Sequence, residues 1–179
     1  MISNEYVEAK SSDKNSNLQL KGYASVFNVV DYHGDVIIKG AFASSILRHF
    51  SGHTIKFLWQ HKHVSPIGII DNLKEDNVGL YVECSINAGV LKGYEIISLV
   101  KQGAIDSFSI GFNVKDSRLN KNGCREILDI DLWEISVVTF PANCYARINT
   151  QNQTNHLNQH NLNVVSQRLN SISKTIFYL

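Results

Sequence analysis

The sequence has almost no net charge, because its 17 Lys and Arg residues are nearly balanced by 16 Asp and Glu residues. A protein that binds nucleic acid through its phosphates usually shows a basic surplus, so no nucleic-acid partner is expected. Long apolar runs are also missing. The longest ones, such as residues 135–140, are far shorter than the roughly 20 residues that cross a bilayer. We therefore expect no membrane-spanning segment.

Cysteine is scarce and irregularly placed. The three residues, Cys84, Cys124 and Cys144, form no CxxC pair, which excludes the common zinc and redox motifs. The first residues are polar and partly acidic, without the apolar stretch of a secretory signal. We therefore expect free thiols in a soluble, intracellular protein that uses neither a metal ion nor a cofactor.

Composition divides the chain into three parts. Residues 1–17 are polar and are expected to form a flexible lead. Residues 149–179 begin with a stretch dense in Asn and Gln and are expected to form a flexible tail. Residues 18–148 hold most of the apolar residues, enough for one domain.

The middle part predicts an α+β domain with six or more strands. Apolar residues recur at helical spacing in residues 41–50 and 90–103, and Gly103 stands where a left-handed helix cap belongs. Runs rich in β-branched and aromatic residues predict strands at residues 18–30, 54–61, 66–70, 78–86, 106–114 and 125–140. Short connections make most neighbouring strands antiparallel.

His61 is the first residue that could carry chemistry. It ends the apolar strand predicted for residues 54–61, and that strand could hold its imidazole rigidly at a cleft. Histidine changes charge near neutral pH, which suits a general base. His63 competes for this role. The two histidines could together bind a metal ion, but only Asp and Glu are nearby as further ligands, so a zinc site is not expected. From spacing alone, a rim histidine without a role is the simpler interpretation.

Ser107 and Ser109 have i, i+2 spacing in a predicted strand, so they face the same side. The alternate residues Phe108, Ile110 and Phe112 face the core. Gly111 beside them would let another backbone approach closely. A serine attacks a carbonyl only when a base takes its proton, so Ser109 is a candidate nucleophile only if His61 lies within reach. Otherwise the pair are ordinary strand serines, since the G-x-S-x-G elbow is absent.

Glu134 lies between two apolar residues of a predicted strand. A carboxylate buried there requires a partner, and an imidazolium is one such partner. A carboxylate that orients the histidine is what a catalytic triad needs. Asp131 faces the opposite side if the strand is regular. The alternative for Glu134 is a solvated or salt-bridged residue paired with Arg125 or Arg147.

Five segments form an ordered series along the chain: GYASVF (22–27), DVIIKGAF (35–42), LWQH with PIG (58–61 and 66–68), GAIDSFSIGF (103–112) and LWEISVVTFPAN (132–143). In this order they resemble the prohead protease family of tailed bacteriophages. Each segment alone is weakly specific, but five in the right order and spacing are specific.

The resemblance implies a mostly antiparallel, β-barrel-like core with a few helices, similar to the herpesvirus maturational proteases of the assemblin type. It implies that Ser109 is the nucleophile and His61 the general base. Glu134 maps to the third position, where the herpesvirus enzymes carry a second histidine. All three residues are present in this chain.

The resemblance leaves two assignments open, the third catalytic residue and the choice between two serines. Asp131 and Ser136 lie in the same segment as Glu134 and are alternatives for the third position. Ser107 stands where many relatives have glycine, so it offers a second hydroxyl beside Ser109.

The implied function is serine endopeptidase activity in phage head maturation. Such an enzyme cleaves scaffold and capsid precursors, and often itself, inside the assembling prohead in the host cytoplasm. Self-cleavage could remove the tail at residues 149–179, and a homodimer or higher oligomer is worth testing. Two other functions compete: an inactive family member that assists capsid or scaffold assembly, and a different hydrolase such as an esterase.

Overall fold

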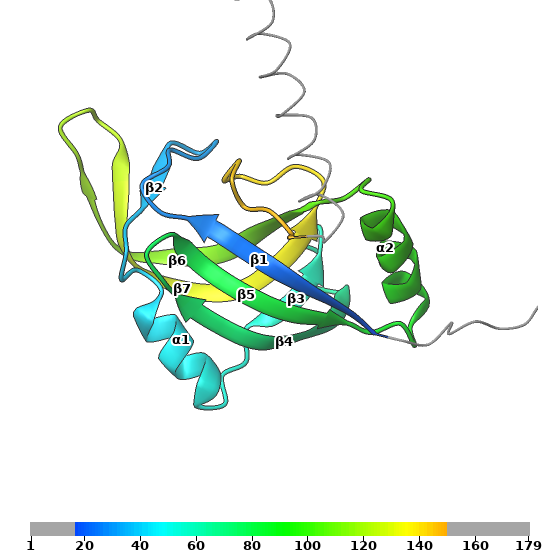
Figure 1. Ribbon diagram of the computed structural model, residues 1–179. Coiled ribbons are helices and arrows are strands. Elements are labelled where there is room, and N and C mark those ends of the chain that lie inside the picture. The colour runs from blue at the N-terminus through cyan, green and yellow to red at the C-terminus, as the bar shows by residue number, and fades with distance from the viewer. Residues whose placement is uncertain (1–16, 150–179) are drawn as a thin grey trace, which may run out of the picture.

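The computed structural model describes residues 17–149, which form one curled sheet and two helices (Figure 1). In this range the elements are, in order, β1 (Leu18–Val26), β2 (Asp35–Ile37), α1 (Ala43–Phe50), β3 (Lys56–Trp59), β4 (Pro66–Glu75), β5 (Gly79–Ile86), α2 (Leu91–Lys101), β6 (Ser107–Leu119) and β7 (Arg125–Val138). Neither helix has the length and apolar character that crossing a membrane requires. The predicted α+β class is confirmed.

Strand β7 connects the parts of the sheet. The strand order is β1-β5-β4-β3-β7-β2, and β6 pairs with β7 as well. Strands β2 and β3 run parallel to β7, at its beginning and its end respectively. All other pairs are antiparallel, as the sequence predicts for most of them. Residues of β3 and β6 therefore reach the same end of β7 from its two sides.

The residues after β7 close the curled sheet toward a barrel. Arg147 forms a bridge with Ser107 at the start of β6, and Ile148 forms one with Gly22 in β1. A Cβ atom on Gly22 would lie 2.0 Å from the carbonyl oxygen of Arg147, so only glycine permits this approach. The predicted barrel-like core is confirmed, with the free edges of β1 and β6 bridged by this segment.

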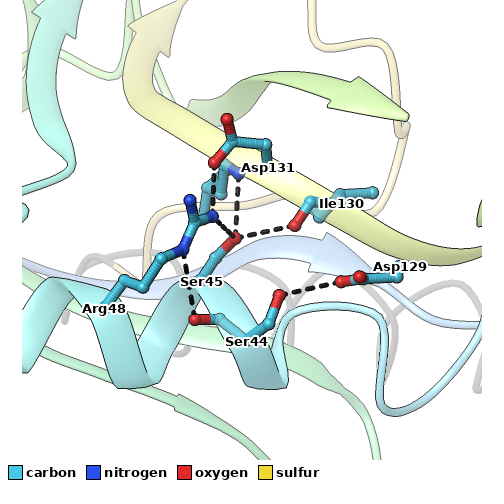
Figure 2. Close-up of polar contacts among 7 residues, drawn as sticks. Ser44, Ser45, Arg48, Asp129, Ile130 and Asp131 are labelled. Carbon is cyan, nitrogen blue, oxygen red and sulfur yellow. Dashed lines mark hydrogen bonds and ion pairs between the residues drawn. The ribbon is translucent and has the colours of Figure 1, made fainter. Parts of the chain in front are cut away.

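Helix α1 is fastened to β7 by polar contacts that Figure 2 shows. The Ser45 hydroxyl donates to the carbonyl of Ile130 at 2.8 Å and accepts the N–H of Leu132 at 2.9 Å. The guanidinium of Arg48 pairs with the carboxylate of Asp131. We call Ser45, Arg48 and Asp131 the α1 anchor. Its contacts hold the helix against the strand, and they satisfy the hydroxyl of the buried Ser45.

Element boundaries differ from the predicted ones mainly at strand ends. The segment at 54–61 forms a strand only over Lys56–Trp59, whereas β6 continues past residue 114 to Leu119 in a long hairpin with β7. The helix cap at Gly103 is confirmed, with φ of 73°. The lead predicted for residues 1–17 and the tail predicted for 149–179 lie almost wholly outside the described residues.

Candidate active site

His61 and Ser109 line the same cleft, which has a volume of about 710 Å³. A cleft of this size suits a short stretch of extended peptide or a small molecule. Its walls come from β1, β2, β6 and the segments at 29–33 and 140–143. Apolar side chains dominate the walls, and the Asp35–Arg125 ion pair (2.7 Å) supplies charge.

His61 lies in a turn, two residues beyond the end of β3, so the prediction that a strand holds it is wrong. Gln60 and His61 have φ of 51° and 57°, in the left-handed region. That conformation costs an L-residue roughly 1–2 kcal/mol. Hydrogen bonds to β7 and its end maintain it: Gln60 N–H donates to Val137 O at 3.0 Å, and the Gln60 side-chain amide donates to Thr139 Oγ1 at 2.7 Å.

Glu134 meets the imidazole of His61. The Glu134 Oε1 atom lies 2.6 Å from His61 Nδ1. The Glu134 side chain is 6% exposed, whereas the His61 side chain is 43% exposed. The second oxygen, Oε2, accepts the hydroxyl of Ser136 at 2.6 Å. Both oxygens of this buried carboxylate are hydrogen-bonded, which is the condition for burying it at acceptable cost.

Ser109 lies beside this pair through the register of β6 with β7. Ser109 is opposite Ser136, and Gly111 is opposite Glu134. Directly opposed residues of an antiparallel pair have Cβ atoms about 5 Å apart on one face. Within residues 17–149 no hydrogen bond joins Ser109 to His61. Such contacts often tighten only when substrate is bound.

Gly111 provides the space that Glu134 occupies. A Cβ atom at this position would lie 2.3 Å from Glu134 Oε1 and 3.0 Å from Glu134 Cδ. The sequence predicts that a neighbouring backbone approaches this glycine. The group that approaches is instead the carboxylate that contacts His61.

The alternative residues have other partners. The Ser107 hydroxyl donates to Asp106 at 2.6 Å and accepts from Arg147 at 2.7 Å, and Ser107 does not line the cleft. Asp131 belongs to the α1 anchor. The register of β7 also shifts between residues 132 and 134, so the regular alternation assumed for Asp131 does not hold.

Other nucleophiles and metal ligands gain no support in the described part of the chain. Residues 17–149 contain no group of three or more His, Cys, Asp or Glu side chains placed for a metal ion. The three cysteines are free, and burial raises the pKa of the Cys84 thiol, which keeps it protonated. His63 is exposed in the turn after β3.

Ser136 is the site residue whose role the sequence does not reveal. It is fully buried, and its hydroxyl contacts both Glu134 and the backbone of His61. Its spacing from Glu134, two residues along one strand, was the available signal, because such residues share a face.

Two phage proteins are similar to this chain over most of its folded part. The prohead protease of Enterobacteria phage HK97 is 37% identical over 131 residues, covering 72% of this chain and 57% of that protein. The prohead protease of Escherichia phage T5 is 34% identical over 135 residues, covering 74% of this chain and 62% of that protein. The chain thus spans somewhat less than two thirds of the length of either relative.

A solved structure shares the fold. The bacteriophage T4 capsid assembly protease aligns with a TM-score of 0.57 over 68% of this chain and 81% of that one, at 11% identity. A family model described as caudovirus prohead serine protease matches residues 5–160. The chain therefore belongs to the caudovirus prohead serine protease family.

Proposed function

We propose that this protein is a serine endopeptidase of phage head maturation, with Ser109 as nucleophile, His61 as general base and Glu134 as the carboxylate that orients the base. The observation that carries the proposal is the 2.6 Å contact between His61 and a buried Glu134, at the cleft that Ser109 lines. Family membership supports the reaction class, because the matching model describes serine proteases.

In the proposed mechanism each proton has a defined path. With its Nδ1–H donated to Glu134 Oε1, the imidazole of His61 keeps Nε2 free to take the Ser109 hydroxyl proton. The Ser109 oxygen then attacks the scissile carbonyl carbon, and His61 returns the proton to the leaving amine. In the second half, His61 takes a proton from water, which attacks the acyl carbon. The ester bond to Ser109 breaks, His61 returns the proton to the Ser109 oxygen, and the carboxylic acid product leaves. Glu134 stabilises the imidazolium in both halves.

The proposed substrates are capsid and scaffold precursors, cut inside the assembling prohead in the host cytoplasm. The names of the two phage relatives and of the T4 enzyme place those proteins in prohead or capsid assembly. The mainly apolar cleft fits an extended segment of such a protein. Removal of residues 149–179 by self-cleavage, and assembly as a dimer, are further predictions.

The test is coexpression with the capsid and scaffold proteins of the same phage, followed by intact-mass measurement of all components. The wild type is expected to shorten at least one of them, and itself if it processes itself. Ser109→Ala is expected to leave every component at full length. Ser107→Ala is the matched control, because it removes a hydroxyl two residues away that lies outside the cleft, and its products should match those of the wild type.

Three outcomes would overturn parts of the proposal. Cleavage by Ser109→Ala would show that another residue is the nucleophile. Uncut components in the presence of well-folded wild type would favour a non-enzymatic assembly factor. Reaction of wild type with a small ester but not with any phage protein would indicate an esterase.

A further inference from the structure

Ser136 completes a closed ring of hydrogen bonds with His61 and Glu134. Its Oγ atom lies 3.0 Å from the backbone nitrogen of His61 and 2.6 Å from Glu134 Oε2. The ring closes through Glu134 Oε1 and His61 Nδ1 at 2.6 Å. One hydroxyl therefore contacts both the carboxylate and the backbone of the residue that carries the imidazole.

The direction of each hydrogen bond in this ring is fixed by chemistry. A backbone N–H can only donate, so Ser136 Oγ accepts from His61. An ionised carboxylate can only accept, so the Ser136 hydroxyl proton points to Glu134 and the His61 Nδ1–H points to the other oxygen. This pattern holds His61 in the tautomer whose Nε2 can accept a proton. The Ser136 hydroxyl thereby uses its one donor proton and one of its acceptor sites.

Ser136 also helps to hold a strained backbone. Gln60 and His61 both have left-handed φ values, and His61 and Ser136 are 75 positions apart in the chain. Strained residues persist only where the surrounding structure constrains them. Without the Ser136 hydroxyl, His61 N–H loses its partner and the turn loses one of its ties to β7.

We propose that Ser136 is a positioning residue for the catalytic base: it fixes the His61 backbone and the Glu134 carboxylate so that the imidazole keeps its tautomer and its place beside Ser109. The inference rests on the proposed function of His61 and Ser109. Ser136 touches no substrate in this scheme and acts through its two neighbours. It is fully buried opposite Ser109, and it is the one residue of β7 with a side-chain hydroxyl.

The chain supplies a matched control in α1, a buried serine that contacts the same strand. Ser45 of the α1 anchor is 2% exposed, and its hydroxyl likewise donates to and accepts from groups of β7. It does not line the cleft that holds His61 and Ser109. Ser45→Ala and Ser136→Ala thus both remove a buried hydroxyl with its hydrogen bonds, but only Ser136→Ala alters the ring around His61.

Two readouts test the inference. The first is the rate at which a fluorophosphonate modifies Ser109, measured at protein concentrations and temperatures where circular dichroism shows each variant folded. The second is the low-field proton NMR signal of His61 Nδ1–H, assigned by its loss in His61→Gln, which requires no turnover. Each is measured in wild type, Ser136→Ala, Ser136→Thr and Ser45→Ala.

Ser136→Ala is expected to slow the modification by about 10- to 100-fold, the effect of moving a catalytic group by about an ångström. Its Nδ1–H signal should vanish or move upfield. Ser136→Thr, which keeps a hydroxyl, should recover part of the rate and the signal, and Ser45→Ala should match wild type in both. If Ser136→Ala keeps the signal and reacts as fast as Ser45→Ala, the inference is wrong. A wild type that shows the signal but never reacts would instead contradict the proposed function.

Discussion

Two regions of β7 contain similar chemical groups but differ in what those groups can do. At one end, Ser136, Glu134 and His61 form the hydrogen-bonded ring beside the cleft. Nearer the middle of the strand, the α1 anchor joins Ser45, Asp131 and Arg48 (Figure 2). Each region combines a buried serine, a carboxylate and a basic group, and each ties a segment distant in sequence to the same strand.

The two regions differ in their basic group and in whether that group borders the cleft. A guanidinium group does not act as a general base in proteins, so the pair of Arg48 with Asp131 is assigned a structural role. The imidazole of His61 can take up and release a proton, and it borders a cleft that also contains a serine. The lesson is that a buried serine beside a carboxylate marks a candidate active site only when an imidazole and a second serine adjoin them at a cleft.

The largest expected effect is on turnover, and it separates the variant that neutralises Glu134 from the one that neutralises Asp131. Glu134→Gln should lower turnover by roughly 10³- to 10⁴-fold, because an amide no longer stabilises the imidazolium or selects its tautomer. Asp131→Asn should leave turnover close to that of wild type, since Asp131 contacts Arg48 rather than His61. Steady-state kinetics on a cleaved precursor peptide measures both. Equal losses in the two variants would remove the distinction between the regions.

Gly111→Ala should cause the next largest loss of turnover. The added methyl group would collide with Glu134 and push the carboxylate away from His61, lowering turnover by about 10²-fold. Gly103→Ala is the matched control: its φ of 73° strains an alanine, but no atom lies within 4 Å of the added carbon. Gly103→Ala should therefore lower only thermal stability. Normal turnover in Gly111→Ala would contradict the placement of Glu134.

Ser45→Ala should lower the free energy of unfolding and leave turnover unchanged. Leaving the Leu132 N–H without its partner is expected to cost about 1–3 kcal/mol of unfolding free energy. Urea denaturation gives this value, and the kinetic assay should show turnover like that of wild type. A large loss of turnover in folded Ser45→Ala would mean that α1 packing also controls the catalytic groups.

The smallest expected effect is on the pH dependence of the free energy of unfolding. It concerns His49, which lies in α1 beside Arg48. Burial lowers the pKa of His49 below its ordinary value of 6.5, and its Nδ1 accepts the N–H of Ile55 at 3.0 Å, as the neutral ring can. The folded state thus binds the proton less well than the unfolded state. The stability contributed by neutral His49 is present above pH 6.5 and is lost as pH falls through the folded-state pKa. Denaturation of wild type and His49→Gln between pH 7 and 5 should show a shallower decline in the variant; parallel declines would contradict this.

Much of the fold could be predicted from local patterns. The helix ending at Gly103 and the turn at residues 120–123 depend on neighbouring residues, and both are present. The family resemblance also selected His61, Ser109 and Glu134, which the structure brings to one region of the molecule.

The remaining features depend on contacts between distant segments. The left-handed turn at Gln60 and His61 carries no glycine to signal it, and hydrogen bonds to β7 and its end maintain it. The shift of register beside Trp133 arises from pairing with β6, so alternation along β7 alone could not place Asp131. The spacing of Ser136 from Glu134 indicates a shared face, but the contact of Ser136 with the His61 backbone depends on pairing between distant segments.

The most direct test of the central claim is to map the site of fluorophosphonate modification by mass spectrometry in wild type and His61→Gln. The account predicts one phosphonyl group on Ser109 in wild type, none on Ser107, and no modification of His61→Gln under the same conditions, because only His61 activates the hydroxyl. Modification of another residue, or of Ser109 at the wild-type rate in His61→Gln, would contradict it.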